Sequence, residues 1–514
     1  MRIGGFVTCS HDASVSIINQ DGDIEFASGS ERFTRKKYDR ILSKTLIDKL
    51  IDSEVQVFFE DYSTKFWERQ KTLHWSRIVK RLPDDEKVSS ETLKMFNDPE
   101  SITSFLAQHK PHHHVSHAAA SFYTRPWQSH DDTVMLSVDG FGSDTWVSSA
   151  IYTYDEATNE FVQKFKSGRS IGNLYSDITW FLGYSDHEAG TVMGLSAMGV
   201  PKYESLVEQI FEQVVPDMVE EADKDFLSQY SLHKLNKSCR QNLQNLLQEK
   251  IDKSHPKWRE DLAASLQKVA ETKIKALAEI ARKYGSKLCY AGGVAQNIIA
   301  NSKIKDMFDD VWIASDPTDA GSSLGAAAWF WGKEFGRTNI NWLDAYLGYN
   351  ITRSINPKEV VDYLLENKVC GVANGQAEFG PRALGNRSLI GDVRYDIKDT
   401  VNGIKKREKF RPFGPLILEE EFDKWFEGHT NGYMQYICKP KHDLNSVIHI
   451  DGTSRVQTVP PHSRSIIRPI LEEYFERTGM PMLLNTSLNI KGQPMVNNEH
   501  DAVNFEKKYK VKVF

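Results

Sequence analysis

The sequence predicts an α/β protein made of two units. Apolar, strand-like runs alternate with helix-like segments along most of the 514 residues, and this alternation is typical of α/β folds. Several of these runs end in turns of glycine and other small residues, which suit the loops at the edge of a sheet. A polar segment over residues 336–350 contains the expected boundary. We therefore expect one domain over residues 1–340 and another over residues 350–514.

The strands of the first unit are expected in two groups, one at the N-terminus and one from the middle of the chain onward. They lie at residues 3–8, 14–18, 24–27, 134–138, 147–154, 161–165, 288–290 and 311–314. The tetrapeptide QDGD at residues 20–23 is a hairpin turn between two of them. Helices are expected over much of residues 201–285 and over residues 323–330, and the second α/β unit starts at residue 356.

Three turns that follow strand-like runs are predicted to face a nucleotide. They cover residues 10–14, 139–144 and 292–297, and the second contains the carboxylate of Asp139. Turns of this kind present backbone N–H groups at a loop or a helix N-terminus, where they bind anions. Three of them in one unit indicate a nucleotide cradle. The structural alternative is a set of tight connections in an α/β sheet.

The composition favours a cytoplasmic enzyme. Hydrophobic residues make up 40% and charged residues 26% of the chain, which is ordinary for a soluble globular protein. No run approaches about 18 uninterrupted apolar residues, so we expect no membrane span, and the N-terminus lacks the apolar core of a secretory signal. The five cysteines form no CxxC pair, which favours free thiols in a reducing cytoplasm. A formal net charge of −6 disfavours simple electrostatic binding of nucleic acid, although a local basic groove could override it.

A histidine-rich segment before an alanine-rich run predicts a metal site. The run reads as a helix, in which His113 and His117 are one turn apart on the same face. That spacing suits two imidazoles on one ion. Asp319 is the expected third ligand, because it lies at a strand-to-helix turn just before Gly321. Two imidazoles and one carboxylate suit Fe(II) or another divalent ion, whereas the alternative is a surface loop that happens to be rich in histidine.

A basic stretch over residues 376–415 predicts a site for a highly charged anion. Its basic residues are Arg382, Arg387, Arg394, Lys405, Lys406, Arg407, Lys409 and Arg411. Glycines and prolines between them fix the loop backbone, which can hold guanidinium groups at set angles. Such groups suit carboxylate and phosphate. The alternative is a solvated basic face with structural turns.

Polar side chains at the end of a late apolar run add to this picture. Asn485, Ser487 and Asn489 alternate at the end of the run MLLNTSLN. Alternating polar groups at a strand end can hydrogen-bond a small planar group or a phosphate, or they can simply cap a turn after a buried strand.

The chain resembles the ATP-dependent O-carbamoyltransferases of the nodulation and tobramycin carbamoyltransferase type, over nearly its whole length. The motifs that carry the resemblance occur in the family's order: SHDAS at 10–14, SERFTRKKYD at 30–39, HHVSHAAASF at 113–122, VDGFG at 138–142, VMGLSAMG at 192–199, AGGVAQN at 291–297, DAGSSLGAA at 319–327, EFGPRALGNRS at 378–388, KKREKFRPF at 405–413 and LNTSLN at 484–489. The C-terminal motifs are very specific. Departures at Ser143, Thr191, Ala197 and Leu488 put details of acceptor or nucleotide contact in doubt and leave the reaction class intact.

This resemblance implies a fold and a two-step reaction. The N-terminal part is expected to be an actin-like ATPase domain, similar to the threonylcarbamoyl-transferase domain, and the C-terminal part a YrdC-like α/β domain. In the C-terminal domain, carbamoyl phosphate would be cleaved to carbamate, which attacks ATP to give carbamoyl adenylate and pyrophosphate. In the N-terminal domain, the carbamoyl group would pass to an acceptor hydroxyl with release of AMP.

The resemblance also implies roles for residues at the matching positions. Arg382, Lys405, Arg407 and Arg411 would hold the anionic substrates, with Asn386, Asn485, Ser487 and Asn489 as polar partners. His113, His117 and Asp319 would hold the metal, with Fe(II) expected there and Mg²⁺ an option with ATP. Asp139, Gly140, Gly292, Gly293 and Asn297 would contact the nucleotide, Asp139 through its phosphate or the metal's waters. His11 or Asp12 could take the acceptor's proton.

The acceptor hydroxyl stays open. Family members modify sugars or other small natural products, and a hydroxymethylated pyrimidine, free or in DNA, offers the same kind of primary alcohol. Residues 62–81 interleave aromatic and basic side chains, a pattern that can line nucleic acid but that also fits an amphipathic helix. A small-molecule kinase on the same fold is the alternative function, although it would explain neither the histidine pair nor the basic cluster. The oligomeric state also stays open, with a homodimer as one option.

Overall fold

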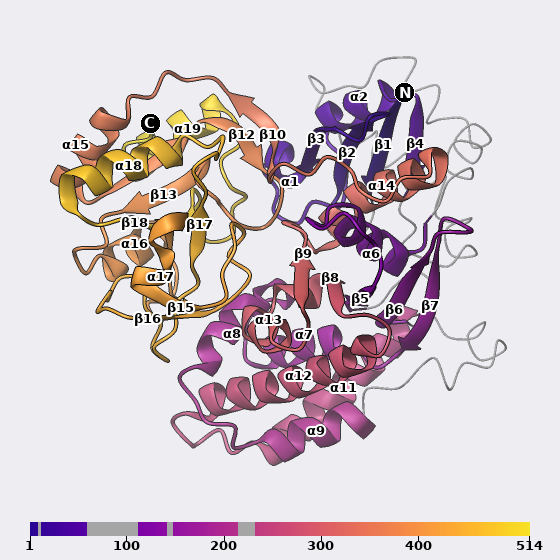
Figure 1. The fold of residues 1–514 in the computed structure, drawn as a ribbon. Coiled ribbons are helices and arrows are strands. Elements are labelled where there is room, and N and C mark those ends of the chain that lie inside the picture. Colours follow the sequence, from indigo (N-terminus) through magenta and orange to yellow (C-terminus); the bar gives the residue numbers. More distant parts are fainter. Residues whose placement is uncertain (9–11, 59–110, 141–146, 214–231) are drawn as a thin grey trace.

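A computed structural model describes residues 1–8, 12–58, 111–140, 147–213 and 232–514 of the chain (Figure 1). His11, residues 62–81 and the end of the predicted turn at 139–144 lie outside these ranges. The predicted α/β class is confirmed, since strands and helices alternate along the chain. None of the helices in the described ranges combines the length and apolarity needed to cross a bilayer.

The N-terminal sheet is covered on both faces. It contains β1 (Arg2–Val7), β2 (Ser14–Asn19), β3 (Ile24–Gly29) and β4 (Val55–Phe58) in the order β3-β2-β1-β4. The first three strands are antiparallel, and β4 is parallel to β1. Helix α2 (Lys44–Ile51) packs on one face and α14 (Ser322–Phe335) on the other. Both faces are buried, since even Ser14 and Ser16, which alternate with apolar residues in β2, are 0% exposed.

A second sheet repeats the same arrangement with one more strand. It contains β5 (Thr133–Val138), β6 (Ser149–Asp155), β7 (Glu160–Ser167), β8 (Lys287–Ala291) and β9 (Asp310–Ile313) in the order β7-β6-β5-β8-β9. Strands β5, β6 and β7 are antiparallel, while β8 and β9 run parallel to β5. Two sheets that each start with an antiparallel meander and continue with parallel strands form the actin-like architecture that the resemblance implied.

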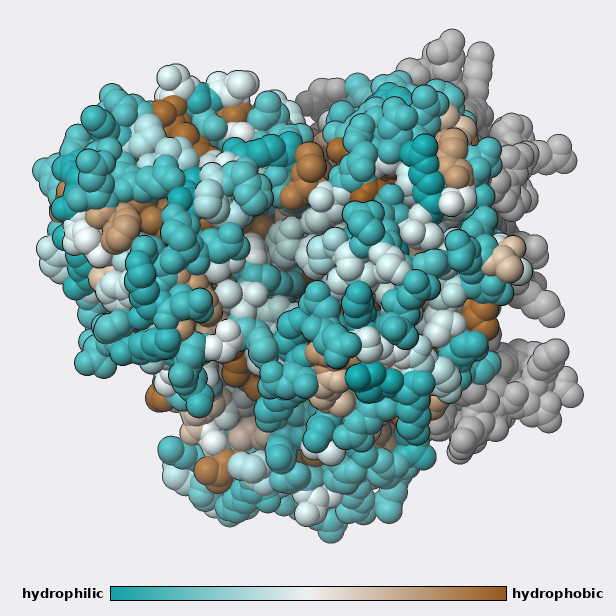
Figure 2. Space-filling view, viewed as in Figure 1, coloured by the Kyte–Doolittle hydropathy of each residue, from teal (hydrophilic) through white to brown (hydrophobic). Residues whose placement is uncertain are grey.

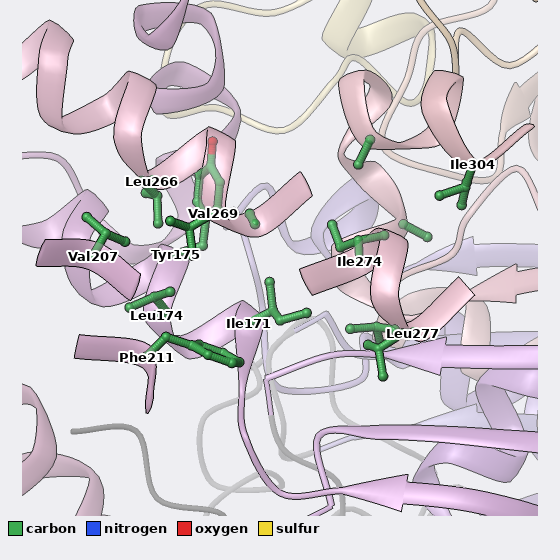
Figure 3. Packing of buried hydrophobic residues seen from close by; sticks show 14 of the residues in the cluster. Ile171, Leu174, Tyr175, Val207, Phe211, Leu266, Val269, Ile274, Leu277 and Ile304 are labelled. Atoms are coloured by element: carbon green, nitrogen blue, oxygen red, sulfur yellow. The ribbon is translucent and has the colours of Figure 1, made fainter. Parts of the chain in front are cut away.

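Two helices lie between these sheets, and several more cover the far side of the second sheet. Helix α6 (His113–Tyr123) packs along α14, and one hydrophobic cluster joins both helices to strands of both sheets. The covering helices are α7 (Ile171–Phe181), α8 (Ala189–Ser196), α9 (Glu204–Gln213), α11 (Leu232–Lys250), α12 (Trp258–Arg282) and α13 (Ile298–Lys305). Figure 3 shows their apolar side chains meeting in one layer, with Leu174 from α7, Phe211 from α9 and Leu266 from α12.

The C-terminal part has a mixed sheet of its own. The sheet contains β11 (Val369–Ala373), β13 (Arg387–Gly391), β18 (Met482–Ser487), β14 (Gly414–Leu418) and β17 (Gln457–Val459) in the order β11-β13-β18-β14-β17. Helices α15 (Pro357–Asn367) and α18 (Ile467–Thr478) cover one face. Helices α16 (Lys398–Lys405) and α19 (Glu499–Tyr509) lie on the other. Its likeness to YrdC-type domains stays a prediction, as do the domain boundaries.

Shorter elements connect these layers. They are α1 (Glu31–Thr34), the 3-10 turns Asp186–Glu188, Gly293–Gln296, Asp319–Gly321 and Glu419–Glu421, the pair β10 (Tyr346–Ile351) and β12 (Gly375–Glu378), α17 (Phe422–Trp425), and the pair β15 (Phe426–Gly428) and β16 (Cys438–Pro440). The face of the molecule in Figure 2 is mostly hydrophilic, with single hydrophobic residues scattered over it.

Close packing of α6 on α14 depends on glycine. A Cβ at Gly325 would lie 1.8 Å from the carbonyl oxygen of Ser116, and one at Gly332 would lie 2.1 Å from the hydroxyl oxygen of Tyr123. Both distances are far shorter than any real contact, so a side chain at either position would force the two helices apart. The glycines of α14 therefore set how closely α6, the helix that carries His113 and His117, packs against α14.

We expect Gly325→Ala to lower the free energy of unfolding by about 1–3 kcal/mol or more, the cost of overpacking a rigid core. Thermal or denaturant unfolding of the purified variant measures this loss. Gly403→Ala in α16 is the matched control, because nothing lies within 4 Å of the added Cβ and alanine is the better helix former. A Gly325→Ala protein as stable as the wild type would contradict the packing argument.

Candidate functional site

Four side chains from three parts of the N-terminal region meet in one buried cluster. Helix α6 brings the Nε2 atoms of His113 and His117 to within 3.2 Å of each other. Asp139 follows the last residue of β5, and its Oδ2 lies 3.2 Å from His117 Nε2. Asp319 begins the 3-10 turn before α14, and its Oδ1 lies 3.3 Å from the same nitrogen. The structure thus brings the three predicted metal ligands together and adds Asp139 to them.

The cluster fits a divalent metal ion. One donor atom from each of the four residues lies within 4.8 Å of all the others, as expected of ligands that share an ion at about 2.0–2.2 Å. Imidazole and carboxylate together suit several divalent transition metals. Sequence reasoning placed Asp139 against the phosphate or the metal's waters, whereas its carboxylate lies among the donor atoms.

Neighbouring groups orient this donor set. Ser322 Oγ hydrogen-bonds His117 Nδ1 at 3.1 Å, which leaves Nε2 directed at the carboxylates. The N–H groups of Gly140 and Gly293 donate to the two oxygens of Asp139 at 2.6 and 2.7 Å. Hydrogen bonds of this kind hold the ligand side chains in place and strengthen metal binding.

The electrostatics of the cluster match its geometry. Burial would raise the pKa of Asp139, but hydrogen bonding and the charge of His117 hold it well below its usual range. Burial would lower the pKa of His117, yet hydrogen bonds and charge from Asp139 and Asp319 outweigh it and raise the pKa to about 9. Two carboxylates this close together need a cation, which an imidazolium or a metal ion can supply.

The backbone itself requires glycine at position 292. Its φ is +93°, and a Cβ there would lie 2.1 Å from the carbonyl oxygen of Val138. The turn after β8 can therefore pass directly against the end of β5, which brings Gly293 to Asp139. Asn297 caps α13 by accepting from the N–H of Ala300, and its amide also pairs with Gln267.

One cavity of about 770 Å³ joins the N-terminal cluster to the C-terminal part. Among the predicted site residues, those that line it are Asp12, Asp139, Gly140, Gly293, Asn297, Asp319, Arg382, Lys405, Arg407, Arg411, Asn485, Ser487 and Asn489. His113 and His117 are 1% exposed and lie behind Asp139 and Asp319. Residues far apart in the sequence therefore line one and the same cavity.

Lys405 and the end of β18 form one unit at the C-terminal side of this cavity. Lys405 Nζ donates to Ser487 Oγ at 3.2 Å, to Asn489 Oδ1 at 3.0 Å and to the carbonyl oxygen of Asn489 at 2.9 Å. It also donates to the carbonyl oxygen of Ser487. Burial and the charges of Arg407 and Arg411 lower the pKa of Lys405 well below its usual value. Ser487 and Asn489, at the end of β18, thus hold the ammonium group of Lys405 in place.

Arginine side chains crowd around Lys405 in the same cavity. Burial and Arg411 lower the pKa of Arg382 to about 10 and that of Arg407 to about 9. Arg455 belongs to this group, because burial and then Arg382 and Arg407 lower its pKa as well. Sequence reasoning missed Arg455, which lies outside the glycine- and proline-rich stretch. Such a concentration of positive charge is unfavourable alone and favourable around an anion.

Other basic residues of the predicted cluster have structural partners instead. Arg387 is 0% exposed and donates to the carbonyl oxygens of Tyr349, Asn374, Asn386 and Asn497. Arg394 pairs with Asp392, and the exposed Lys409 pairs with Asp399.

Asn386, a predicted polar partner of the substrates, is not among the described residues that line the cavity. Its amide donates to the carbonyl oxygen of Gln376 and accepts from Ser465 Oγ.

Glu378 holds the loop that carries Arg382. One of its oxygens, Oε1, accepts from the backbone N–H groups of Leu384, Asn386 and Arg387 at 2.8, 2.9 and 3.1 Å. The residue is 3% exposed, so water cannot replace these bonds. A single buried carboxylate therefore fixes the curvature of the loop and with it the position of the Arg382 guanidinium.

Glu378→Ala is expected to destabilise the protein by about 1–3 kcal/mol for each buried N–H left without an acceptor. Glu378→Gln keeps an oxygen at the same place and should cost clearly less. Comparing the unfolding curves of the two variants measures the difference. Equal stability of both variants would show that the three N–H groups do not depend on this oxygen.

Comparisons with known proteins show which family the chain is similar to. A family model for the carbamoyltransferase N-terminus matches residues 87–328, and one for the carbamoyltransferase C-terminus matches residues 361–514. Nodulation protein NolO of Bradyrhizobium diazoefficiens is 29% identical over 427 residues, which cover 76% of this chain and 75% of that protein. Nodulation protein NolNO of Sinorhizobium fredii is 28% identical over 551 residues, which cover 96% of this chain and 76% of that protein.

Solved structures show a more distant likeness. The activator of the 2-hydroxyisocaproyl-CoA dehydratase from Clostridium difficile with bound ADPNP is 12% identical, covers 65% of this chain and 95% of its own, and has a TM-score of 0.32. HypF of T. kodakarensis is 12% identical, covers 66% of this chain and 48% of its own, and also has a TM-score of 0.32.

Proposed function

Because the chain belongs to the carbamoyltransferase family, we propose that it makes carbamoyl adenylate from carbamoyl phosphate and ATP and then transfers the carbamoyl group to an acceptor hydroxyl. The observation that supports this most is the shared cavity. Arg382, Lys405 and Arg411 line it from the C-terminal part of the chain, and Asp139 and Asp319 line it from the N-terminal part. A charged intermediate made among the cations can reach the N-terminal cluster without leaving the protein.

The first half of the proposed reaction takes place among the cations. Water cleaves carbamoyl phosphate to carbamate and phosphate, and a carbamate oxygen then attacks the α-phosphorus of ATP, with pyrophosphate leaving. Both steps bring several negative charges together. Arg382, Lys405, Arg407, Arg411 and Arg455 would stabilise them, since preorganised cations in an enclosed site act without reorganisation. Residues 350–514 are the proposed domain for this half.

The second half takes place at the N-terminal cluster, within the proposed domain of residues 1–340. The acceptor oxygen attacks the carbamoyl carbon, and the bond from that carbon to the AMP phosphate oxygen breaks. Asp12, which lines the cavity, is the proposed base for the acceptor's proton. His113, His117, Asp139 and Asp319 would hold a divalent ion, Fe(II) in our proposal, which when bound polarises the reacting group and stabilises negative charge.

The products of an assay with purified protein test this proposal. With carbamoyl phosphate and ATP we expect phosphate and pyrophosphate, each dependent on carbamoyl phosphate, and AMP when an acceptor hydroxyl is also present. ADP formed without carbamoyl phosphate would instead indicate a kinase and would overturn the proposal. Offering aminoglycosides, nucleosides and hydroxymethylcytosine DNA, and reading the mass increase of one carbamoyl group, then identifies the acceptor class.

A further inference from the structure

A histidine and a carboxylate that lie outside the residues assigned so far stand on the cavity wall. His449 and Asp451 belong to the segment between β16 and β17, and both line the cavity. The same segment continues through Thr453 to Arg455, which lies among the cations. One short stretch of chain thus presents an imidazole, a carboxylate and a guanidinium to the same space.

Backbone and side-chain bonds fix this pair. The N–H of His449 donates to the carbonyl oxygen of Thr453 at 2.8 Å, and the N–H of Gly452 donates to the carbonyl oxygen of His449 at 3.0 Å. Asp451 Oδ1 accepts from the N–H and the hydroxyl of Thr453 at 3.0 and 2.7 Å. The same oxygen lies 3.5 Å from His449 Nδ1. The carboxylate is therefore held in place beside the imidazole.

The other ring nitrogen of His449, Nε2, has no such partner among the described residues. The His449 side chain is 10% exposed, and its Nε2 is buried and forms no hydrogen bond with any residue that the structure describes. With Asp451 beside Nδ1, the proton of the neutral ring is favoured on Nδ1. The lone pair of Nε2 is then left to accept a proton. A buried polar atom without a partner is uncommon and calls for a ligand or a reaction that uses it.

The electrostatics keep Asp451 ready for this role. Burial would raise its pKa, but His449 and Thr453 outweigh burial and lower the pKa to about 2. The carboxylate stays ionised at neutral pH, so it can stabilise a positive charge that forms on the ring.

The steps of the proposed reaction differ in their need for a base. Carbamate is already an anion, so its attack on ATP releases no proton. The acceptor hydroxyl loses its proton in the second half of the reaction, for which Asp12, another residue that lines the cavity, is the proposed base. The cleavage of carbamoyl phosphate by water does release a proton, and Arg455 provides a phosphate-binding cation on the same segment as His449.

We propose that His449 is the general base that activates water for the cleavage of carbamoyl phosphate. Nε2 takes a proton from water, the water oxygen bonds to phosphorus, and the phosphorus–oxygen bond to the carbamoyl group breaks. Carbamate leaves with that electron pair, phosphate carries the new oxygen, and Asp451 stabilises the imidazolium until it loses its proton to solvent. This proposal rests on the function proposed above and adds a residue to its first step.

Two assays of His449→Gln in the full-length protein test the role. General-base catalysis typically contributes about 10²–10⁴-fold, so we expect phosphate release from carbamoyl phosphate, corrected for the enzyme-free rate, to fall by about that factor. Pyrophosphate formation from ATP and ammonium carbamate bypasses the water step and should stay close to the wild-type rate. Asp451→Asn should also slow the first assay selectively, and His442→Gln at an exposed histidine is the control.

The two assays distinguish a failure of the proposed function from a failure of the role assigned to His449. Wild-type protein that forms no pyrophosphate from either carbamoyl donor would overturn the proposed function itself. If the wild type is active in both assays, a His449→Gln variant that loses both would show a structural role, and one that keeps phosphate release would show no role. Either result would overturn the assignment of His449.

Discussion

Replacing Lys405 by methionine is expected to reduce carbamoyl-phosphate-dependent pyrophosphate release by about 10²–10³-fold, the typical cost of removing one preorganised group that stabilises developing charge. Methionine keeps most of the length and apolar character of the side chain but removes the ammonium group. That group is buried, and Ser487 and Asn489 direct it. A coupled pyrophosphate assay at saturating ATP and carbamoyl phosphate measures the loss.

A matched variant separates this effect from a general loss of positive charge. Lys409 comes from the same basic stretch, but its side chain is 80% exposed and pairs with Asp399. Lys409→Met should therefore release pyrophosphate at nearly the wild-type rate. The thermal unfolding of both variants should be recorded, because Lys405→Met also removes the donor from buried oxygens. A folded Lys405→Met protein with pyrophosphate release within about tenfold of the wild type would contradict a role in charge stabilisation.

The contrast between Lys405 and its basic neighbours shows what the sequence could and could not predict. A glycine- and proline-rich loop with many arginines indicates an anion site, and Arg382, Arg407 and Arg411 do line the cavity. The same pattern also contains Arg387, whose guanidinium binds four backbone carbonyls in the interior. Which way a guanidinium points depends on the tertiary position of its acceptors, and residue type and spacing do not encode that.

The N-terminal cluster was easier to predict because most of its geometry is local. Helical spacing alone puts His113 and His117 on one face, and α6 does contain both residues. Asp139 and Asp319 reach them only because β5 ends at the same edge of the second sheet as β8 and β9 do. The sequence marked both carboxylates as strand-end residues. Their meeting at one point depends on strand order, which is why Asp139 was expected at the phosphate.

The segment between β16 and β17 contains no local sequence pattern that predicts a site. Arg455 and His449 lie in the run HIDGTSRVQTV, which has a single glycine and no proline. Their shared position on the cavity wall results from two backbone pairings. Strand β17 pairs in parallel with β14, and Cys438 and Ser454 form an isolated antiparallel β-bridge. Long-range strand pairing of this kind could not be read from the sequence alone.

His117→Ala is expected to remove most of the bound metal and to lower carbamoyl transfer by at least about 100-fold, while pyrophosphate formation stays near the wild-type rate. His117 Nε2 is the donor atom that lies closest to both carboxylates, at 3.2 and 3.3 Å. Loss of a residue that merely orients a ligand costs about 10–100-fold in affinity or activity, so loss of a ligand should cost at least as much. Elemental analysis of the purified protein gives the metal content independently of any activity.

The exposed His112 provides the control, because it precedes α6 and is not one of the clustered donors. His112→Gln should retain metal and transfer. Separation of the two half-reactions in His117→Ala is the decisive result, since we propose that adenylate formation uses the C-terminal cations and transfer uses the N-terminal cluster. A variant that keeps its full metal content would remove His117 from the ligand set, and one that loses both half-reactions together while remaining folded would show that the cations and the cluster do not act separately.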